Sequence, residues 1–251
     1  IGVDLYRMDW AFYYDAVFED MMIGIWVRGS NPAFSHVRIN NVNIGVKIDY
    51  VGGAGIQLVD SEINASCGYR PVGILFHRSD SSNPYAAVTV TNTKFGGKPY
   101  SAIYMRDTDI MDSAVNVNNC IFANWENYAI EAYSGTVIAH NSTFSKPERH
   151  IYLGEYCEGA TLVDNQFGGK ADIVNKSANA VQMGGSVSMP PMKPYEYHFA
   201  PEYKPAGTAF INAAGAPYLA PADNSSDSTA KIQKALNDCQ AAGGGTVFLP
   251  A

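Results

Sequence analysis

The sequence predicts an all-β chain, a right-handed single-stranded parallel β-helix with a short capping helix near its C-terminus. A motif of Asn or Asp three residues before Phe or Ile recurs along the chain, at intervals of roughly 20–30 residues that are typical of solenoid repeats. A short apolar strand bounded by Gly, Asn, Ser or Asp follows each copy, as in half-buried β-structure. A repeat this short cannot bury its own apolar face, so the copies are expected to stack.

The repeats can be placed individually. The motif occupies Asp15/Phe18, Asn41/Ile44, Asp60/Ile63, Asn92/Phe95, Asn119/Phe122, Asn141/Phe144 and Asp164/Phe167. Each following strand places one isoleucine in the predicted interior, namely Ile25, Ile48, Ile74, Ile103, Ile130, Ile151 and Ile173. Because Asn and Asp tolerate left-handed backbone and can satisfy bend groups, we interpret the motif polar residues as architectural. Loops are expected at Cys67–Pro71, Arg78–Tyr85 and Asp107–Ser113.

Three segments are predicted. Residues 1–176 are the β-helix coils, and residues 177–222 are a linker rich in Pro, including Met189–Pro194. Proline prevents regular structure over most of this stretch, yet the segment also carries Tyr195, Tyr197 and Phe199. A free linker would be polar, so we expect an ordered connector lying along the first β-helix. Residues 223–251 are predicted to form a helix and a short strand.

The last segment carries the pattern D-x-T-x-x-I-Q-x-A-L followed by G-G-G-T-V-x-L-P, from Asp227 to Pro250. This pattern resembles the opening of pectate-lyase-superfamily β-helices, where such a helix caps the stack. With the coils upstream, the layout is similar to the tandem β-helix proteins of glycoside hydrolase family 55, the exo-β-1,3-glucanases. The resemblance implies a second β-helix after Ala251 that carries the catalytic acid, so no family catalytic residue can be assigned within this chain.

Composition narrows the classes of function. The net charge of −7 and the absence of a basic run argue against nucleic-acid binding. No apolar run approaches the ~18 residues of a membrane span. The four cysteines form no C-x-x-C pair, so zinc is not supported. No cofactor is expected, and Cys120 is predicted to be a small core residue. The chain begins inside a strand-like run, so we expect missing N-terminal sequence and either a longer chain or a second chain that completes the ends.

Residues that alternate with the interior isoleucines must point outwards. The first outward column is predicted as Trp26, Lys47, Leu75, Tyr104, Glu131, Tyr152 and Val174. The second is predicted as Arg28, Asp49, His77, Arg106, Tyr133, Gly154 and Lys176. Aromatic faces stack on pyranose rings, and charged side chains bond hydroxyls. The candidate substrate-binding residues are therefore Trp26, Arg28, Asp49, His77, Tyr104, Arg106, Tyr133 and Tyr152. The alternative is that aromatic residues simply form good strands.

Glycoside hydrolysis needs carboxyl groups about the scissile bond. Glu131 is the candidate catalytic acid because Tyr104 and Tyr152 flank it in the predicted register. Asp107 is its first candidate partner, and Asp49 and Glu155 are alternatives. A uronate-polysaccharide lyase, using Lys47 and Arg106, and a non-catalytic glycan-binding or structural β-helix remain alternatives. The expected function is hydrolysis of a β-glucan-type polysaccharide by a secreted or periplasmic protein.

Overall fold

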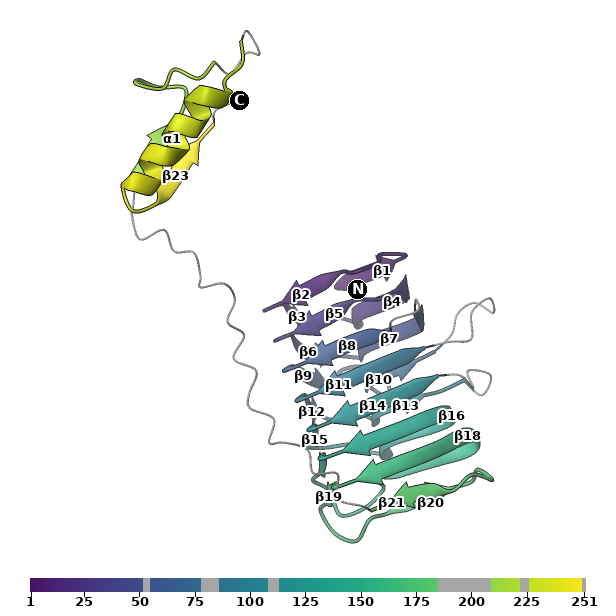
Figure 1. Ribbon diagram of the computed structural model, residues 1–251. Helices are drawn as coiled ribbons and strands as arrows, with labels where there is room; N and C mark the ends of the chain where they lie inside the picture. The colour runs from purple at the N-terminus through teal and green to yellow at the C-terminus, as the bar shows by residue number, and fades with distance from the viewer. Residues whose placement is uncertain (52–54, 78–85, 108–112, 185–208, 222–225, 250–251) are drawn as a thin grey trace. The chain divides into compact units, whose positions relative to one another are not determined.

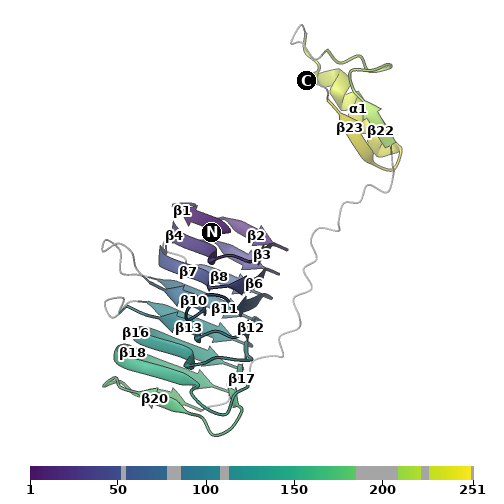
Figure 2. The same cartoon turned by 180° about the vertical axis from the view of Figure 1, so that it is seen from behind.

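The computed structural model describes residues 1–51, 55–77, 86–107, 113–184, 209–221 and 226–249. The chain divides into two compact units, Ile1–Ser188 and Met189–Ala251. The first unit is a parallel β-solenoid with three faces, each built from one strand per coil (Figures 1 and 2). All strand pairs in it are parallel between described residues, which confirms the predicted parallel β-helix.

The three faces follow one another around each coil. The first face contains β1 (Val3–Tyr6), β4 (Ile23–Ser30), β7 (Ile44–Val51), β10 (Val72–Phe76), β13 (Ser101–Met105), the first parts of β16 (Tyr128–His140) and β18 (Ile151–Val163), and β20 (Ile173–Asn175). The second face contains β2 (Phe12–Tyr14), β5 (Ala33–Ser35), β8 (Ile56–Val59), β11 (Ala87–Thr91), β14 (Ala114–Asn118), the last parts of β16 and β18, and β21 (Val181–Met183). The third face contains β3 (Val17–Glu19), β6 (Arg38–Val42), β9 (Glu62–Ala65), β12 (Lys94–Gly97), β15 (Ile121–Phe122), β17 (Thr143–Phe144) and β19 (Gln166–Phe167). The coils thus continue to Met183, beyond the predicted boundary at residue 176.

The corner between the second and third faces is built by residues with left-handed backbone. These residues are Asp15, His36, Asp60, Asn92, Asn119, Asn141 and Asp164. Their side chains bond along the stack, since Asn119 Nδ2 donates to Asn92 Oδ1 over 3.2 Å and Asn92 donates to Asp60. The architectural interpretation of the motif is therefore confirmed for its Asn and Asp residues at this corner, which are Asp15, Asp60, Asn92, Asn119, Asn141 and Asp164.

The predicted motif was wrong in the second coil. Phe18 pairs with Ile39 and Ile39 with Ile63, so the apolar member of that coil is Ile39 and its bend residue is His36. Asn41 also has left-handed backbone, but it lies at the next corner and donates to Asp20 over 2.7 Å. The second coil departs from the Asn or Asp motif because a histidine, His36, occupies the left-handed position there.

The interior is one continuous apolar core. On the third face Phe95, Phe122, Phe144 and Phe167 stack, with successive ring centroids 4.9, 4.7 and 5.1 Å apart. The predicted interior isoleucines are buried, apart from Ile173, which is half-buried in the last coil. One register differs: Val46, rather than Ile48, pairs with Ile25 and Ile74, and Ile48 pairs with Val27 and Phe76.

The second unit contains a parallel pair of strands, β22 (Ala209–Asn212) and β23 (Gly245–Phe248), and the helix α1 (Thr229–Ala241). The helix begins after Ser228, and Asp227 Oδ1 accepts a hydrogen bond from the Thr229 amide over 2.9 Å. Ala235 and Cys239 are the buried residues of the helix. The strand β22 lies inside the segment predicted to be linker.

Some sequence expectations concern residues outside the described ranges. They are the course of the linker over residues 185–208 and the loops at 78–85 and 108–112. Within the described ranges, no helix is long and apolar enough to span a membrane.

Candidate functional site

The first face presents the predicted first outward column in register. Trp26 pairs with Lys47, Lys47 with Leu75, Leu75 with Tyr104 and Tyr104 with Glu131. Tyr152 and Val174 continue the same column. The alternation of side chains around the interior residues Ile103 and Ile130 therefore sets which side chains point outwards.

Two irregularities interrupt the second predicted column. Between Val27 and Arg28 the register with β7 shifts, so Arg28 pairs with Tyr50 rather than with Asp49. Asp49 is only 4% exposed. A second shift lies between Ala132 and Ser134, where β16 pairs with β18. Strict alternation thus fails at bulges, which re-aim individual side chains.

Four tyrosines gather on this face around the β16 strand. The ring centroid of Tyr133 lies 6.1 Å from that of Tyr104 and 5.3 Å from that of Tyr152. Tyr128 lies 5.4 Å from Tyr152. We call these four residues, Tyr104, Tyr128, Tyr133 and Tyr152, the tyrosine platform. All four are half-buried, so each presents part of its ring to solvent.

Glu131 lies beneath the tyrosine platform and is only 3% exposed. Its Oε2 atom accepts hydrogen bonds from Ser101 Oγ over 2.6 Å and Asn127 Nδ2 over 2.9 Å. Its Oε1 atom accepts from the Tyr133 hydroxyl over 3.2 Å. Both oxygens therefore have donors, as a buried carboxylate requires.

Sequence reasoning did not find Ser101, Asn127 or Tyr128 as members of this site. Ser101 and Tyr128 pair across β13 and β16, and they carry a polar side chain at the position where β7 and β10 carry Ile44 and Val72. This replacement of apolar by polar residues in one column is the signal that could have identified them.

Burial raises the pKa of Tyr104, Tyr128 and Tyr133. The Glu131 carboxylate raises the pKa of Tyr104 and Tyr133 further, and Asp172, followed by Glu131, raises that of Tyr128. The shift is largest for Tyr133, which donates to Glu131. All three hydroxyls therefore stay protonated, and able to donate hydrogen bonds, well above neutral pH.

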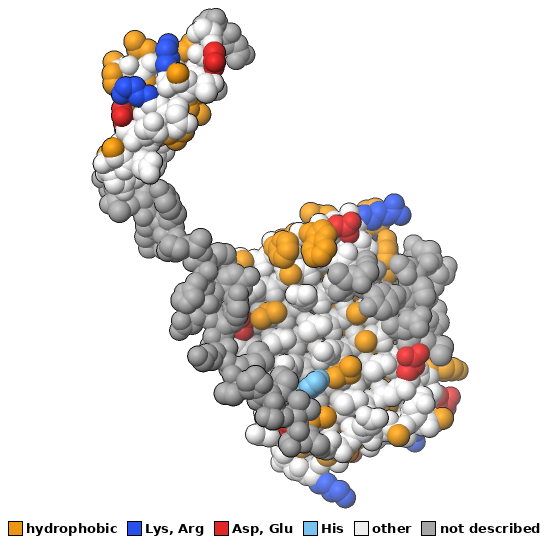
Figure 3. All heavy atoms as spheres, viewed as in Figure 1, with side chains coloured by type: hydrophobic (Ala, Val, Ile, Leu, Met, Phe, Trp, Pro, Cys, Tyr) orange, Lys and Arg blue, Asp and Glu red, His pale blue; other side chains and the backbone are white. Residues whose placement is uncertain are grey.

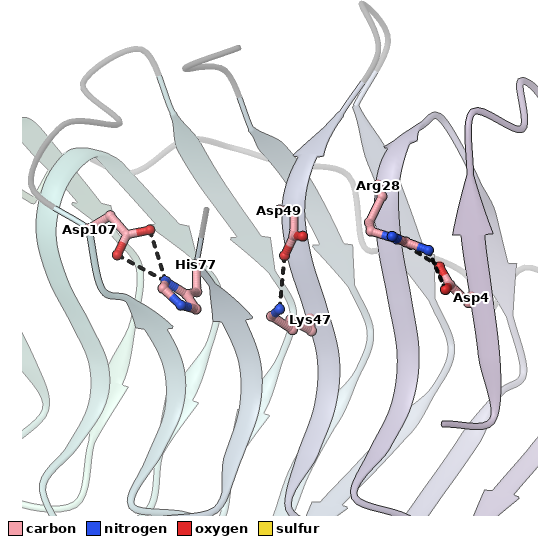
Figure 4. A network of polar contacts seen from close by, with 6 residues as sticks. All are labelled: Asp4, Arg28, Lys47, Asp49, His77 and Asp107. Atoms are coloured by element: carbon pink, nitrogen blue, oxygen red, sulfur yellow. Dashed lines mark hydrogen bonds and ion pairs between the residues drawn. The ribbon is translucent and has the colours of Figure 1, made fainter. Parts of the chain in front are cut away.

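The Asp107 carboxylate contacts the His77 ring (Figure 4). Its oxygens lie 3.1 and 3.2 Å from His77 Nδ1. This contact can fix the orientation of the imidazole ring. The two predicted catalytic carboxyl groups consequently have different partners, with Glu131 held by Ser101 and Asn127.

Trp26 lies in a separate charged cluster near the beginning of the stack. Lys47 Nζ lies 4.1 Å and the Arg28 guanidinium 4.6 Å from its ring centroid. Lys47 also pairs with Asp49 over 3.1 Å, and Arg28 pairs with Asp4 (Figure 4). The cations already occupy ring surface that a sugar would need, so Trp26 is less available for stacking than the tyrosine platform.

The structure defines a parallel β-solenoid that carries a tyrosine-lined outer face. Comparison of the chain with protein-family models, with curated proteins and with solved structures finds no match. Within the described ranges, no group of three His, Cys, Asp or Glu side chains is arranged to hold a metal ion.

Proposed function

We propose that the first face binds a neutral glycan and that the chain is part of a secreted or periplasmic glycoside hydrolase acting on a β-glucan-type polysaccharide. The observation that carries this proposal is the tyrosine platform on a rigid parallel sheet. Adjacent half-exposed rings on neighbouring coils can stack on successive sugar rings. Their hydroxyl groups can donate to sugar oxygens.

The buried Glu131 carboxylate favours a neutral ligand over an acidic one. Burial is the largest cause of the raised pKa of Tyr133, and the Glu131 carboxylate raises that pKa further. The same carboxylate accepts a hydrogen bond from the Tyr133 hydroxyl over 3.2 Å. A uronate bound on the platform would meet the same negative charge in a partly desolvated setting. A β-glucan substrate is therefore favoured over the uronate substrate of a lyase. Of the two candidate lyase residues, Lys47 is paired with Asp49.

The resemblance of the Asp227–Pro250 pattern to the pectate-lyase superfamily supports the same proposal. Family 55 glycoside hydrolases share the tandem layout that the sequence suggests. Because Glu131 is enclosed and fully hydrogen-bonded, we assign it a supporting role under the tyrosine platform. The catalytic acid is then expected outside this face, as the resemblance implies.

Titration of the protein with soluble β-glucan oligosaccharides tests the proposal. Tyr104→Ala is expected to weaken binding by about 1–2 kcal/mol, or roughly tenfold in affinity, because an aromatic anchor is lost. Tyr14→Ala is the matched control, since Tyr14 is exposed on the second face of the same solenoid. Equal loss in both variants, or no binding by the wild type, would overturn the proposal.

Glu131→Gln separates binding from catalysis. The substitution keeps the shape of the side chain and removes its charge, so uronate oligosaccharides should gain affinity relative to neutral ones of equal length. Turnover by the complete protein should remain near wild type if Glu131 only supports the platform. Loss of turnover with binding intact would instead identify Glu131 as the acid.

A further inference from the structure

Tyr69 is an exposed aromatic residue in the middle of the stack. It is 83% exposed, and it precedes β10, which pairs with β7 on one side and with β13 on the other. Figure 3 shows other hydrophobic side chains gathered at the end of the solenoid that carries β2, where Trp10 and Phe12 are exposed. Among the described strands β2 pairs only with β5. A position at the end of the stack therefore explains the exposure of Phe12, but not that of Tyr69.

The loop that carries Tyr69 is held by the coil before it. Asn43 Nδ2 donates hydrogen bonds to the carbonyl oxygens of Cys67 over 3.0 Å and Tyr69 over 3.1 Å. Gly68 has a φ of +76°, and a Cβ atom there would lie 2.7 Å from Asn43 Nδ2, so this turn requires glycine. The backbone at Tyr69 is thus fixed before any ligand arrives, which lowers the entropic cost of binding through its ring.

Arg70 connects Tyr69 with a second tyrosine, Tyr100. The centre of the Arg70 guanidinium lies 5.3 Å from the ring centroid of Tyr69 and 4.7 Å from that of Tyr100. A cation over an aromatic face is attracted to it. Among the described residues Arg70 forms no ion pair, so its N–H groups can donate to a ligand. We call Tyr69, Arg70 and Tyr100 the corner cluster.

The corner cluster is continuous with the tyrosine platform. Tyr100 directly precedes β13, the strand that carries Tyr104. The Asn127 amide donates to the Tyr100 carbonyl over 2.7 Å, and the Asn127 side chain donates to Glu131 beneath the platform. Burial is the largest cause of the raised pKa of Tyr104, and Tyr100 and Arg70 are among the charged groups that also affect it. Both residues therefore lie near the Tyr104 hydroxyl.

Together the corner cluster and the tyrosine platform extend over four neighbouring strands. In order along the stack these are β10, β13, β16 and β18. Neighbouring strands lie about 4.8 Å apart, so β10 and β18 are about 14 Å apart. Aromatic rings distributed over this length offer more surface than one sugar ring can cover. A chain of several sugar units fits them better.

We propose that the corner cluster is a further glycan-binding subsite, which takes the sugar units next to those on the tyrosine platform. The inference rests on the proposed function and extends it, because it makes a chain of several units, running along the stack, the preferred ligand. Tyr69 stacks on the C–H face of a sugar ring. Arg70, placed over the Tyr100 ring, donates hydrogen bonds to sugar hydroxyl groups.

Titration with β-1,3-glucan oligosaccharides of two lengths tests the inference. The wild type should bind a hexasaccharide about tenfold more tightly than a trisaccharide, because only the longer chain reaches both groups of rings. Tyr69→Ala should remove most of this gain and leave the affinity for the trisaccharide unchanged. Tyr69→Phe keeps the ring and should bind both oligosaccharides like the wild type.

The matched control is Tyr6→Ala. Tyr6 is also exposed, and the Arg28 guanidinium lies 4.9 Å from its ring centroid, but it belongs to β1 in the first coil. This variant removes an exposed tyrosine with an arginine over its ring at a distance from the tyrosine platform. It should bind both oligosaccharides like the wild type.

The outcomes separate this inference from the proposed function. If the wild type binds both oligosaccharides with equal affinity, or if Tyr69→Ala and Tyr6→Ala weaken hexasaccharide binding equally, the inference fails and the proposed function stands on trisaccharide binding. A loss in Tyr69→Ala that is confined to uronate oligosaccharides would also overturn the inference, because the corner cluster would then bind an acidic ligand. Absence of binding at either length would overturn both.

Discussion

Cys120 occupies an interior file of small residues directly after the left-handed corner. In neighbouring coils Ser61, Thr93 and Ser142 hold this position, and each hydroxyl donates to the carbonyl two residues earlier. Cys120 Sγ contacts the Asn118 carbonyl at 3.4 Å in the same way. The prediction that Cys120 is a small core residue is confirmed, because its side chain is buried and it is a free cysteine.

Stability should fall at alkaline pH partly through Cys120. Burial raises the pKa of its thiol from 9.0 to about 11. A raised folded-state pKa contributes stability that is complete below pH 9 and is lost as pH rises towards 11, here on the order of 2–3 kcal/mol. The free energy of unfolding, measured by chemical denaturation between pH 8 and 11, should therefore decline less steeply in Cys120→Ser than in the wild type. Cys67→Ser controls for the loss of a half-buried thiol, and an unchanged slope in Cys120→Ser would contradict the account.

The candidate site shows what alternation can and cannot predict for single residues. The period of two placed Tyr104 and Glu131 on the outer side, as the strand pairs confirm. It could not predict that Glu131 is enclosed, because depth depends on how far Tyr133 and Ser101 reach across from neighbouring positions. Likewise, pairing of Asp107 with His77 depends on the path of the chain after β10 and β13.

Among the strands, β16 and β18 run without interruption from the first face into the second. In β16 the turn falls at Gly135, whose φ is +77°. A Cβ atom there would lie 2.3 Å from the Ser113 carbonyl oxygen. Only glycine combines this conformation with this close approach. The sequence pattern predicted the strand that begins near Ala129, but not its continuation around the corner.

Gly135→Ala should therefore destabilise the solenoid more than backbone strain alone would. Left-handed backbone costs a residue with a Cβ atom about 1–2 kcal/mol, and the contact with Ser113 adds to this. Gly184→Ala is the control, because Gly184 has a similar φ of +87° and open space around its Cβ position. Denaturant titration should show a loss larger by at least about 1 kcal/mol for Gly135→Ala. Equal losses would mean that the chain near Ser113 moves aside at no cost.

Bulges explain why some element registers escaped the sequence pattern. The predicted second column assumed that Arg28 and Asp49 are equivalent, but one extra residue in β7 separates them. In the second coil two left-handed residues, His36 and Asn41, lie five positions apart, and composition alone cannot say which one opens the third face. The pairing of Phe18 with Ile39 decides it, and pairing is a property of neighbouring coils.

Across the whole solenoid, each coil is stabilised by contacts with the coils on either side of it. The continuous core and the phenylalanine stack run through successive coils rather than within one. In such a quasi-one-dimensional architecture, stability is approximately a sum of coil and interface contributions. The repeat period was enough to predict this architecture, because stacking is the only way for short repeats to bury their apolar faces.

The loss of stability on substitution of an interior isoleucine should therefore depend on its position in the stack. Ile130 is fully buried and has a partner on both sides, Ile103 and Ile151. Ile130→Asp places an unpaired carboxylate in the core at a cost of several kcal/mol, and it separates the coils before it from those after it. Loss of the cooperative thermal transition and of most of the β-sheet circular dichroism is expected.

Ile173→Asp is the matched change at the end of the stack. Ile173 is half-buried, and β20 pairs only with β18 among the described strands. The new carboxylate can reach water there, so only the last coil should open, and the circular dichroism signal and the main transition should persist. Binding of β-glucan oligosaccharides should weaken modestly in this variant, because Tyr152 pairs with Val174 of the opened coil. If Ile130→Asp and Ile173→Asp were equally damaging, the solenoid would unfold as one indivisible unit, and the description of its stability coil by coil would be wrong.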